Sequence, residues 1–158
     1  MFEESRIKSV AMAQAAQEAW KNIESGNGGP FGAAIVKDGE IIAVAANSVL
    51  EMHDPTAHAE VNAIRKAAAA LSTHDLSGCT IYATGYPCPM CLAAIIWANI
   101  SECYYAQPVE DAAEINFRDE MIYEFIRGEN ELLKLEHLDC EDIKGLYQTY
   151  AENNCQMY

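Results

Sequence analysis

The feature that most constrains this chain is a His-x-Glu motif that is followed later in the sequence by Pro-Cys-x-x-Cys. His58, Cys88 and Cys91 offer three ligands to a zinc ion, which prefers four ligands in a tetrahedral arrangement. A structural zinc takes its fourth ligand from another Cys or His, whereas a catalytic zinc leaves that position to water. Glu60 lies two residues after the histidine and is the candidate proton carrier for such a water. The fold must therefore bring two distant segments to one metal ion.

Each of these residues has a simpler interpretation when it is taken alone. A single histidine is more often a satisfied core residue than a ligand, and Glu60 is one of 24 acidic residues. The complete set favours a metal site, because Cys88 and Cys91 have the spacing that zinc sites use. A binding protein that uses zinc only for stability remains an alternative, but such a site has no use for Glu60.

Length and charge restrict the class of protein. A chain of 158 residues can bury its own core, so we expect one domain over 1–158. The formal net charge is −14, with 24 acidic residues against 10 Lys and Arg, which argues against nucleic acid as a partner. The sequence has neither a signal-peptide pattern nor an apolar run of membrane-spanning length. We therefore expect a cytoplasmic protein with no membrane partner, no disulfide framework and a small free substrate.

Hydrophobic periodicity predicts strands that alternate with helices. Predicted helices cover 5–24, 57–71, 89–98, 110–127 and 141–153. Predicted strands cover 31–36, 41–46, 80–84, 102–106 and 132–138. The first two strands are joined by Asp38-Gly39, which is typical of a tight hairpin. We expect an α/β fold, a three-layer α/β/α sandwich with a central mixed sheet of about five strands.

The two motifs fall at the starts of two predicted helices. His58 and Glu60 begin the helix over 57–71, with Pro55 in the turn that opens it. Cys88 and Cys91 lie at the start of the next helix, where free backbone N–H groups and the helix dipole favour thiolates. Two helix N-termini are therefore expected to meet at the metal.

The order of the elements and both motifs resemble the cytidine deaminase superfamily, and within it they are most similar to bacterial guanine deaminases. The segments that carry the resemblance are 29–33, 54–61, 88–92, 94–98 and 111–114. The resemblance implies one Zn²⁺ per chain and hydrolytic deamination of a free purine base, most simply guanine plus water to xanthine plus ammonia. It also implies a homodimer, in which the helix and tail at 141–158 cap the site or exchange between subunits.

The resemblance also implies substrate contacts for five residues that each have an ordinary alternative. Asn47 would contact the purine, although Asn is common in turns. Phe31 and Trp97 would pack on the purine ring, although both are also plausible core aromatics. Asp119 would accept hydrogen bonds from the ring N–H and the amino group of guanine, although an acid is often only a solvated residue. Tyr158 would lie over the site, although chain ends are often unordered.

One departure from the family pattern leaves the substrate open. Most members carry Glu-Pro-Cys before Cys-x-x-Cys, whereas this chain has Tyr86 at the Glu position. Guanosine, cytosine or an aminotriazine therefore remain alternative substrates for the same site. Editing of adenosine in tRNA uses the same motifs, but the acidic charge disfavours it.

Overall fold

The computed structural model describes residues 2–117 and 119–153, with residues 2–4 described by their backbone only. The chain divides into two units, Met1–Glu120 and Met121–Tyr158. The elements of the first unit are α1 (Phe2–Ser25), β1 (Gly32–Lys37), β2 (Glu40–Ala46), α2 (Val49–Met52), α3 (Ala59–Leu71), β3 (Cys79–Gly85), α4 (Pro89–Trp97), β4 (Glu102–Gln107) and α5 (Val109–Glu114). From Glu120 onward follow α6 (Glu120–Ile126), η1 (Glu141–Ile143) and α7 (Leu146–Glu152).

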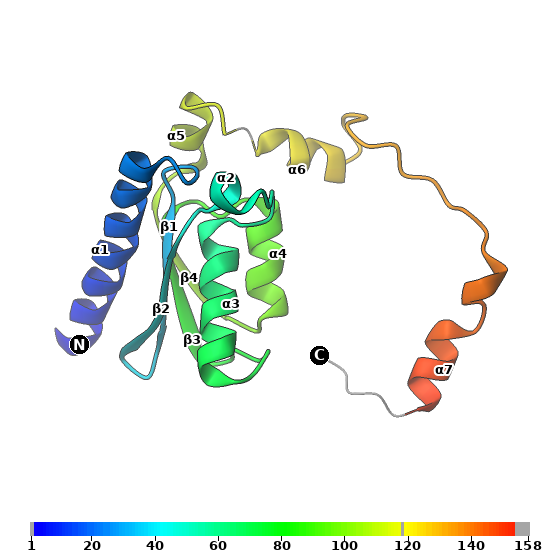
Figure 1. The fold of residues 1–158 in the computed structure, drawn as a ribbon, viewed down its shortest axis with the longest axis horizontal. Coiled ribbons are helices and arrows are strands. Elements are labelled where there is room, and N and C mark those ends of the chain that lie inside the picture. Colours follow the sequence, from blue (N-terminus) through cyan, green and yellow to red (C-terminus); the bar gives the residue numbers. More distant parts are fainter. Residues whose placement is uncertain (1, 118, 154–158) are drawn as a thin grey trace. The chain divides into compact units, whose positions relative to one another are not determined.

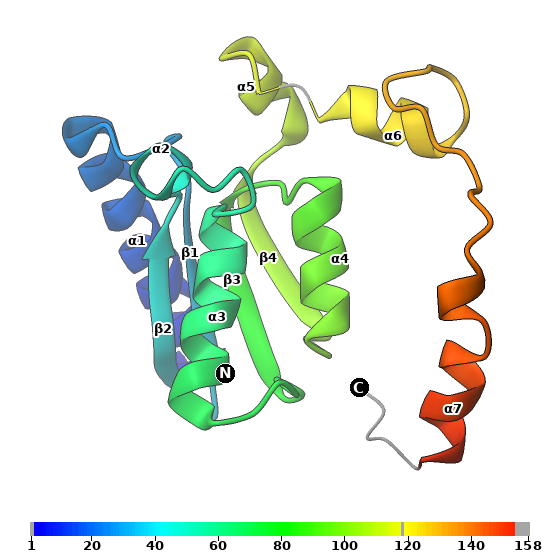
Figure 2. The same ribbon diagram turned by 45° about the vertical axis from the view of Figure 1, so that its right-hand side comes forward.

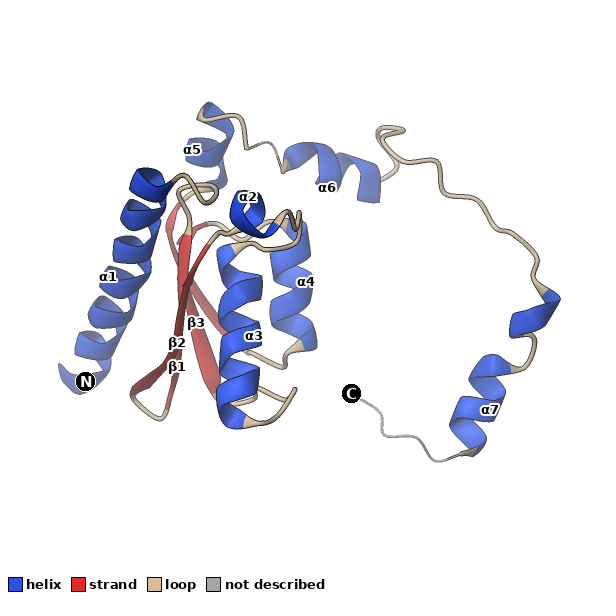
Figure 3. Cartoon of the chain, in the orientation of Figure 1, coloured by secondary structure: helices blue, strands red, loops and turns tan. Residues whose placement is uncertain are grey.

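The strands, drawn in red in Figure 3, form one mixed sheet in the order β2-β1-β3-β4, which can be followed in Figure 2. β1 pairs antiparallel with β2 and with β3, while β3 and β4 run parallel. The hairpin between β1 and β2 is confirmed, because Asp38 and Gly39 both have the positive φ that a tight turn needs, at 50° and 80°.

The prediction of a fifth strand over 132–138 was wrong. The sheet has four strands, and this segment has no regular secondary structure. Its alternating leucines resemble a strand pattern, but a strand also needs a neighbouring backbone to pair with. Within the described residues the segment has none, and Leu135 and Leu138 are 81% and 85% exposed.

Helices cover both faces of the sheet, as Figures 1 and 2 show from two directions. α1 packs on one face, where Ala11 and Ala15 meet Ala34, Val36 and Tyr82. α3 and α4 pack on the other face. The predicted three-layer α/β/α arrangement is therefore confirmed. None of the helices that the structure describes is long and apolar enough to cross a lipid bilayer.

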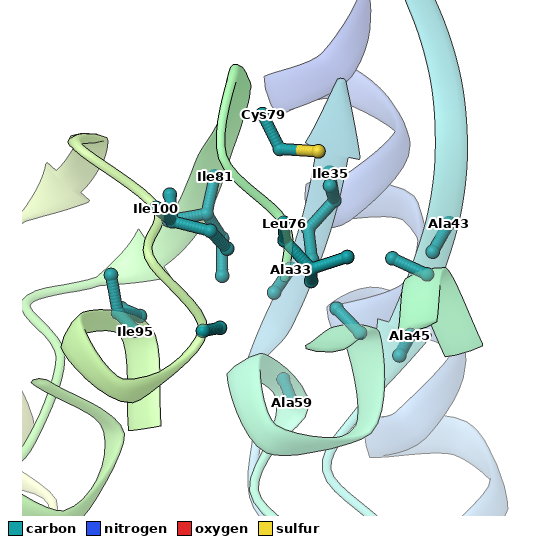
Figure 4. Close-up of a cluster of buried hydrophobic side chains, with 13 residues drawn as sticks. Ala33, Ile35, Ala43, Ala45, Ala59, Leu76, Cys79, Ile81, Ile95 and Ile100 are labelled. Atoms are coloured by element: carbon teal, nitrogen blue, oxygen red, sulfur yellow. The ribbon is translucent and has the colours of Figure 1, made fainter. Parts of the chain in front are cut away.

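The larger core lies between the sheet and the pair α3 and α4 (Figure 4). Ile35 and Ile81 from the central strands and Leu76 are fully buried there, and Ile95 of α4 is nearly so. Each such side chain contributes roughly 1.5–3 kcal/mol when it leaves water. Because this core holds α3 and α4 against one sheet, it also fixes where their N-termini lie.

Two of the predicted helices are interrupted. The helix expected over 110–127 is divided into α5 and α6, and Asn116 lies at the break with a left-handed φ of 69°. The helix expected over 141–153 is divided into η1 and α7, with Gly145 at φ 80° before α7. Positive φ values do not belong to an α-helix, so each break reverses the chain locally. The helix expected from residue 57 begins at Ala59.

Candidate metal centre and active site

The N-termini of α3 and α4 supply the candidate metal ligands. His58 is the N-cap of α3 and Cys88 is the N-cap of α4, and both have extended backbone geometry. Cys91 lies in the first turn of α4, and its backbone N–H donates to Cys88 Sγ at 3.5 Å. Pro89 suits the first helical position, where a missing N–H costs nothing. Each ligand is therefore held by a helix start rather than by a free loop.

The three ligand atoms fit a zinc ion. His58 Nδ1 lies 3.5 Å from Cys88 Sγ and 3.5 Å from Cys91 Sγ. Ordinary zinc bond lengths at tetrahedral angles separate a nitrogen and a sulfur ligand by about 3.5 Å. The three atoms all lie within 4.8 Å of one another, and they are the only such His, Cys, Asp or Glu group among the described residues. The site can hold one metal ion and leaves a fourth position for water.

Burial and charge around the ligands favour a thiolate. Cys91 is fully buried and Cys88 is 7% exposed. A hydrogen bond with Cys91, helped by His58, lowers the pKa of Cys88 to about 4. The bond to Cys88 raises the pKa of His58, and it also raises the pKa of Cys91. The surroundings therefore favour a thiolate at Cys88, which is the form of cysteine that binds a metal ion.

Glu60 lies beside this cluster in the first turn of α3 and is only 8% exposed. Its carboxyl group interacts with its own backbone N–H and with the Cys91 side chain. Burial is the main reason why its pKa is raised, and the negative charge of Cys88 adds to the effect. A buried carboxyl group with a raised pKa next to a metal site can both accept and return a proton.

Asn47 follows β2 directly and is 3% exposed. Its side-chain Oδ1 accepts hydrogen bonds from the backbone N–H of Gly29, at 3.2 Å, and of Val49, at 3.1 Å. The side chain therefore organises the local turn, as the ordinary interpretation predicts. Its Nδ2 donates to none of the described residues, so the same side chain can also meet a ligand.

Asp119 lies in the same unit as the metal ligands, after α5. Burial raises the pKa of its carboxyl group, the charge of Cys88 raises it further, and the charge of His58 lowers it. The carboxyl group is therefore half-buried and is influenced by the charges of two of the metal ligands.

Phe31 precedes β1 and packs on the large core, but it also has an aromatic neighbour outside that core. Its ring meets Phe117 edge to face, with centroids 4.9 Å apart and planes at 87°. Gly29 lies against both rings, because a Cβ there would come 2.9 Å from Phe117 Cζ. Phe117 was not among the residues that the sequence predicted for the site.

The other two predicted substrate contacts, Trp97 and Tyr158, stay predictions. Trp97 is the last residue of α4 and is 68% exposed. It lies six residues beyond Cys91, about 9 Å further along the helix axis and away from the thiolates. Tyr158 lies outside the described residues.

Tyr86 is 37% exposed and precedes the cysteine motif. Its ring packs edge to face on Tyr105 of β4, with centroids 5.0 Å apart, and its N–H donates to Gln107 O at 2.9 Å. The phenol is therefore engaged with the strand next to it.

Two asparagines near the site, the buried Asn22 and the half-buried Asn62, were also not among the residues predicted from the sequence. Asn22 of α1 is 4% exposed and donates to the carbonyls of Gly29 and Asn47. Asn62 of α3 donates to the carbonyls of Ala46 and Ala57. A polar residue on the apolar stripe of a helix is the signal that could have revealed Asn22, since it continues the spacing of buried alanines in α1.

Comparison with known proteins gives the same assignment as the geometry. The cytidine and deoxycytidylate deaminase zinc-binding region matches residues 5–107, which include all three ligands and Glu60. Guanine deaminase from Bacillus subtilis is 52% identical over 108 residues, covering 68% of this chain and 69% of that protein. The tRNA-specific adenosine deaminase of Aquifex aeolicus is 44% identical over 99 residues, covering 63% of this chain and 65% of that protein.

Solved structures extend the similarity to most of the chain. The X-ray structure of B. subtilis guanine deaminase has a TM-score of 0.89 at 40% identity, over 95% of this chain and 98% of that one. A structure of guanine deaminase from Nitrosomonas europaea has a TM-score of 0.65 at 33% identity, over 69% and 63% of the two chains. The fold, the His-Cys-Cys cluster and these matches agree. This chain belongs to the cytidine and deoxycytidylate deaminase family, whose members share the zinc-binding region found here.

Proposed function

We propose that this protein is a guanine deaminase that converts guanine and water to xanthine and ammonia. The observation that carries the proposal is the match to B. subtilis guanine deaminase, which extends over 95% of the chain. The electrostatic coupling of Asp119 to Cys88 and His58 supports it, because guanine offers a ring N–H and an amino group on one edge. A carboxylate suits two such donors, whereas cytosine has no matching edge.

The chemistry follows from the residues around the metal. His58, Cys88 and Cys91 would hold zinc, which supplies a Lewis acid that makes water more acidic. Glu60 would take a proton from the attacking water while the oxygen of that water bonds to the amino-bearing ring carbon. Glu60 would deliver this proton to the ring nitrogen, then take the second proton from the new hydroxyl group on the ring carbon and pass it to the departing amine, so that ammonia leaves and a carbonyl remains. The burial that raises the pKa of Glu60 suits a group that must hold a proton between these steps.

Three side chains would orient the base. Asp119 would accept from the ring N–H and the amino group, and Asn47 would donate its free Nδ2 hydrogens to an acceptor on the ring. Phe31, held by Phe117, would offer an aromatic surface to the purine. Trp97, which is exposed at the end of α4, would add a further aromatic contact to the purine.

The segment after Glu120 would complete the site in an assembly. Its leucines and tyrosines are largely exposed, with Leu135, Leu138 and Tyr147 at 81–89%. Exposed apolar side chains of this number favour association with another surface. We propose a homodimer of single-domain subunits in which the helix and tail at 141–158, with Tyr158, cap the active site of the same or the partner subunit. The five described cysteines are free, which is consistent with a cytoplasmic protein.

Editing of adenosine in tRNA is the second candidate, because tRNA-specific adenosine deaminases are also relatives of this chain. The net charge of −14 opposes a tRNA substrate, since a strong negative field repels phosphates. The two candidates also differ in substrate size, so they can be separated directly.

The experiment is to incubate the zinc-loaded protein with guanine, guanosine, cytosine, adenine and a tRNA substrate, and to follow ammonia release. We expect release from guanine at least a hundredfold faster than from the others. Turnover of another base, with no turnover of guanine, would show that the enzyme is a deaminase of that base and not of guanine. Turnover of the tRNA alone would establish the editing function instead.

A further inference from the structure

Two asparagine side chains hold the backbone on either side of Asn47. Asn22 of α1 donates its Nδ2 to Asn47 O at 2.7 Å. Asn62 of α3 donates its Nδ2 to Ala46 O at 3.0 Å. These two carbonyls belong to consecutive peptide groups, one before and one after the Cα of Asn47. Because α1 and α3 cover opposite faces of the sheet, the end of β2 is fixed from both sides (Figure 1).

Asn22 also holds the loop that orients the side chain of Asn47. Its Nδ2 donates a second hydrogen bond, at 2.7 Å, to Gly29 O. Gly29 in turn donates its N–H to Asn47 Oδ1 at 3.2 Å. One buried amide therefore fixes the backbone of Asn47 and also the group that sets the rotation of the Asn47 side chain.

The loop has little room to settle in another position. A Cβ on Gly28 would collide with Asn47 Oδ1, so this residue must be glycine for the backbone to approach. With Oδ1 held by Gly29 and Val49, the amide plane of Asn47 has one orientation, and its Nδ2 is left to donate elsewhere.

The residue type at position 22 matches this task. Two carbonyl oxygens must be satisfied by one atom in a site that is 4% exposed, and the NH₂ group of asparagine supplies two hydrogens. An aspartate has no hydrogen to donate there, and a serine has only one. A buried carbonyl that loses its donor is costly, so the loop would shift to find another partner.

We propose that Asn22 is a positioning residue for the reaction: it sets the direction in which Asn47 presents its Nδ2 to the purine. The inference rests on the proposed substrate contact of Asn47. Asn22 lies on a different helix from the ligand His58 and from Glu60, so its effect can be measured separately from zinc binding.

The test is a double-mutant cycle of Asn22→Ala and Asn47→Ala, measured as kcat/KM for guanine on zinc-loaded protein. We expect Asn47→Ala to lower kcat/KM about a hundredfold and Asn22→Ala about tenfold, as supporting residues typically do. In the Asn47→Ala background, Asn22→Ala should change kcat/KM less than about twofold, because the group that it orients is gone. Zinc content and melting temperature are measured for every variant.

A tenfold loss from Asn22→Ala in both backgrounds would overturn the proposal, since a purely structural defect does not depend on Asn47. If Asn47→Ala alone leaves kcat/KM unchanged, the substrate contact is wrong and the inference falls with it, while guanine turnover itself stands. Asn22→Ser keeps one hydroxyl donor and replaces Asn22→Ala in the cycle if the alanine variant does not fold. Asn27→Ala is the matched control. The backbone oxygen of Asn27 accepts hydrogen bonds from Leu50 N and Glu51 N, and the substitution leaves this oxygen in place.

Discussion

Phe31 and Phe117 meet edge to face, with ring centroids 4.9 Å apart, and join the start of β1 to the segment after α5. The turn at Asn116 makes the contact possible, because its φ of 69° reverses the chain. Phe117 N then donates to Ala112 O at 3.0 Å. The contact therefore fixes the chain just before Asp119, the proposed partner of the guanine edge.

Phe117→Leu should weaken guanine binding more than it weakens the fold. An aromatic pair is worth about 0.5–1.5 kcal/mol, so the melting temperature should fall by only a few degrees. KM for guanine should rise about threefold to tenfold, because the segment that carries Asp119 loses its anchor. Steady-state kinetics with Phe125→Leu as control checks this, and an unchanged KM would show that Asp119 is positioned by other contacts.

Replacement of a ligand should remove both metal and activity. Cys91→Ser leaves a poor zinc ligand in a fully buried position, so the variant should purify with less than about a tenth of the zinc of the original protein. Metal analysis with Cys140→Ser, an exposed free cysteine, as control separates this from a general effect of lost thiols. Full zinc content in Cys91→Ser would mean that the ion lies elsewhere.

Glu60→Gln should separate metal binding from turnover. The amide keeps the size of the side chain but cannot carry a proton, so kcat should fall about 10²–10⁴-fold while zinc stays bound. The exposed residue Glu24 offers the control Glu24→Gln, which changes charge by the same amount. Loss of zinc together with activity would instead assign Glu60 a role in holding the ligands.

Asp119→Asn should act on substrate choice. Its amide presents a donor where guanine also presents donors, so kcat/KM for guanine should fall about a hundredfold with unchanged zinc content. Asp139→Asn, an exposed residue of the second unit, is the control. Unchanged kcat/KM for guanine would show that Asp119 does not contact the substrate.

Tyr86→Glu should have a small effect on specificity. The Tyr86 ring packs on Tyr105, so its loss should cost about 1 kcal/mol of folding stability and change kcat/KM for guanine less than about threefold. A substrate panel on this variant measures the result. A change of preferred base would identify Tyr86 as the specificity residue.

The metal cluster could be predicted from the sequence because its ligands lie in short motifs with fixed spacing. His58 and the two cysteines lie at helix starts, and helix starts can be recognised from short patterns of capping residues and proline. The hairpin at Asp38-Gly39 was predictable for the same reason, since both residues tolerate positive φ.

Features that depend on tertiary contacts were not predictable in this way. Trp20 and Ile23 continue the helical spacing of apolar residues in α1, yet they are 69% and 56% exposed while Asn22 is buried. The carbonyls of Gly29 and Asn47 select Asn22, and nothing in the local sequence shows that these carbonyls will be there. Likewise the leucines over 132–138 have a strand pattern, but pairing requires a partner strand.

The most direct measurement of the central claim is product identification after guanine is incubated with zinc-loaded protein and, separately, with zinc-loaded Glu60→Gln. We expect stoichiometric xanthine and ammonia from the original protein, and at least a hundredfold slower formation from the variant with equal zinc. Guanine recovered unchanged from the original protein, or xanthine formed equally fast by both, would contradict it.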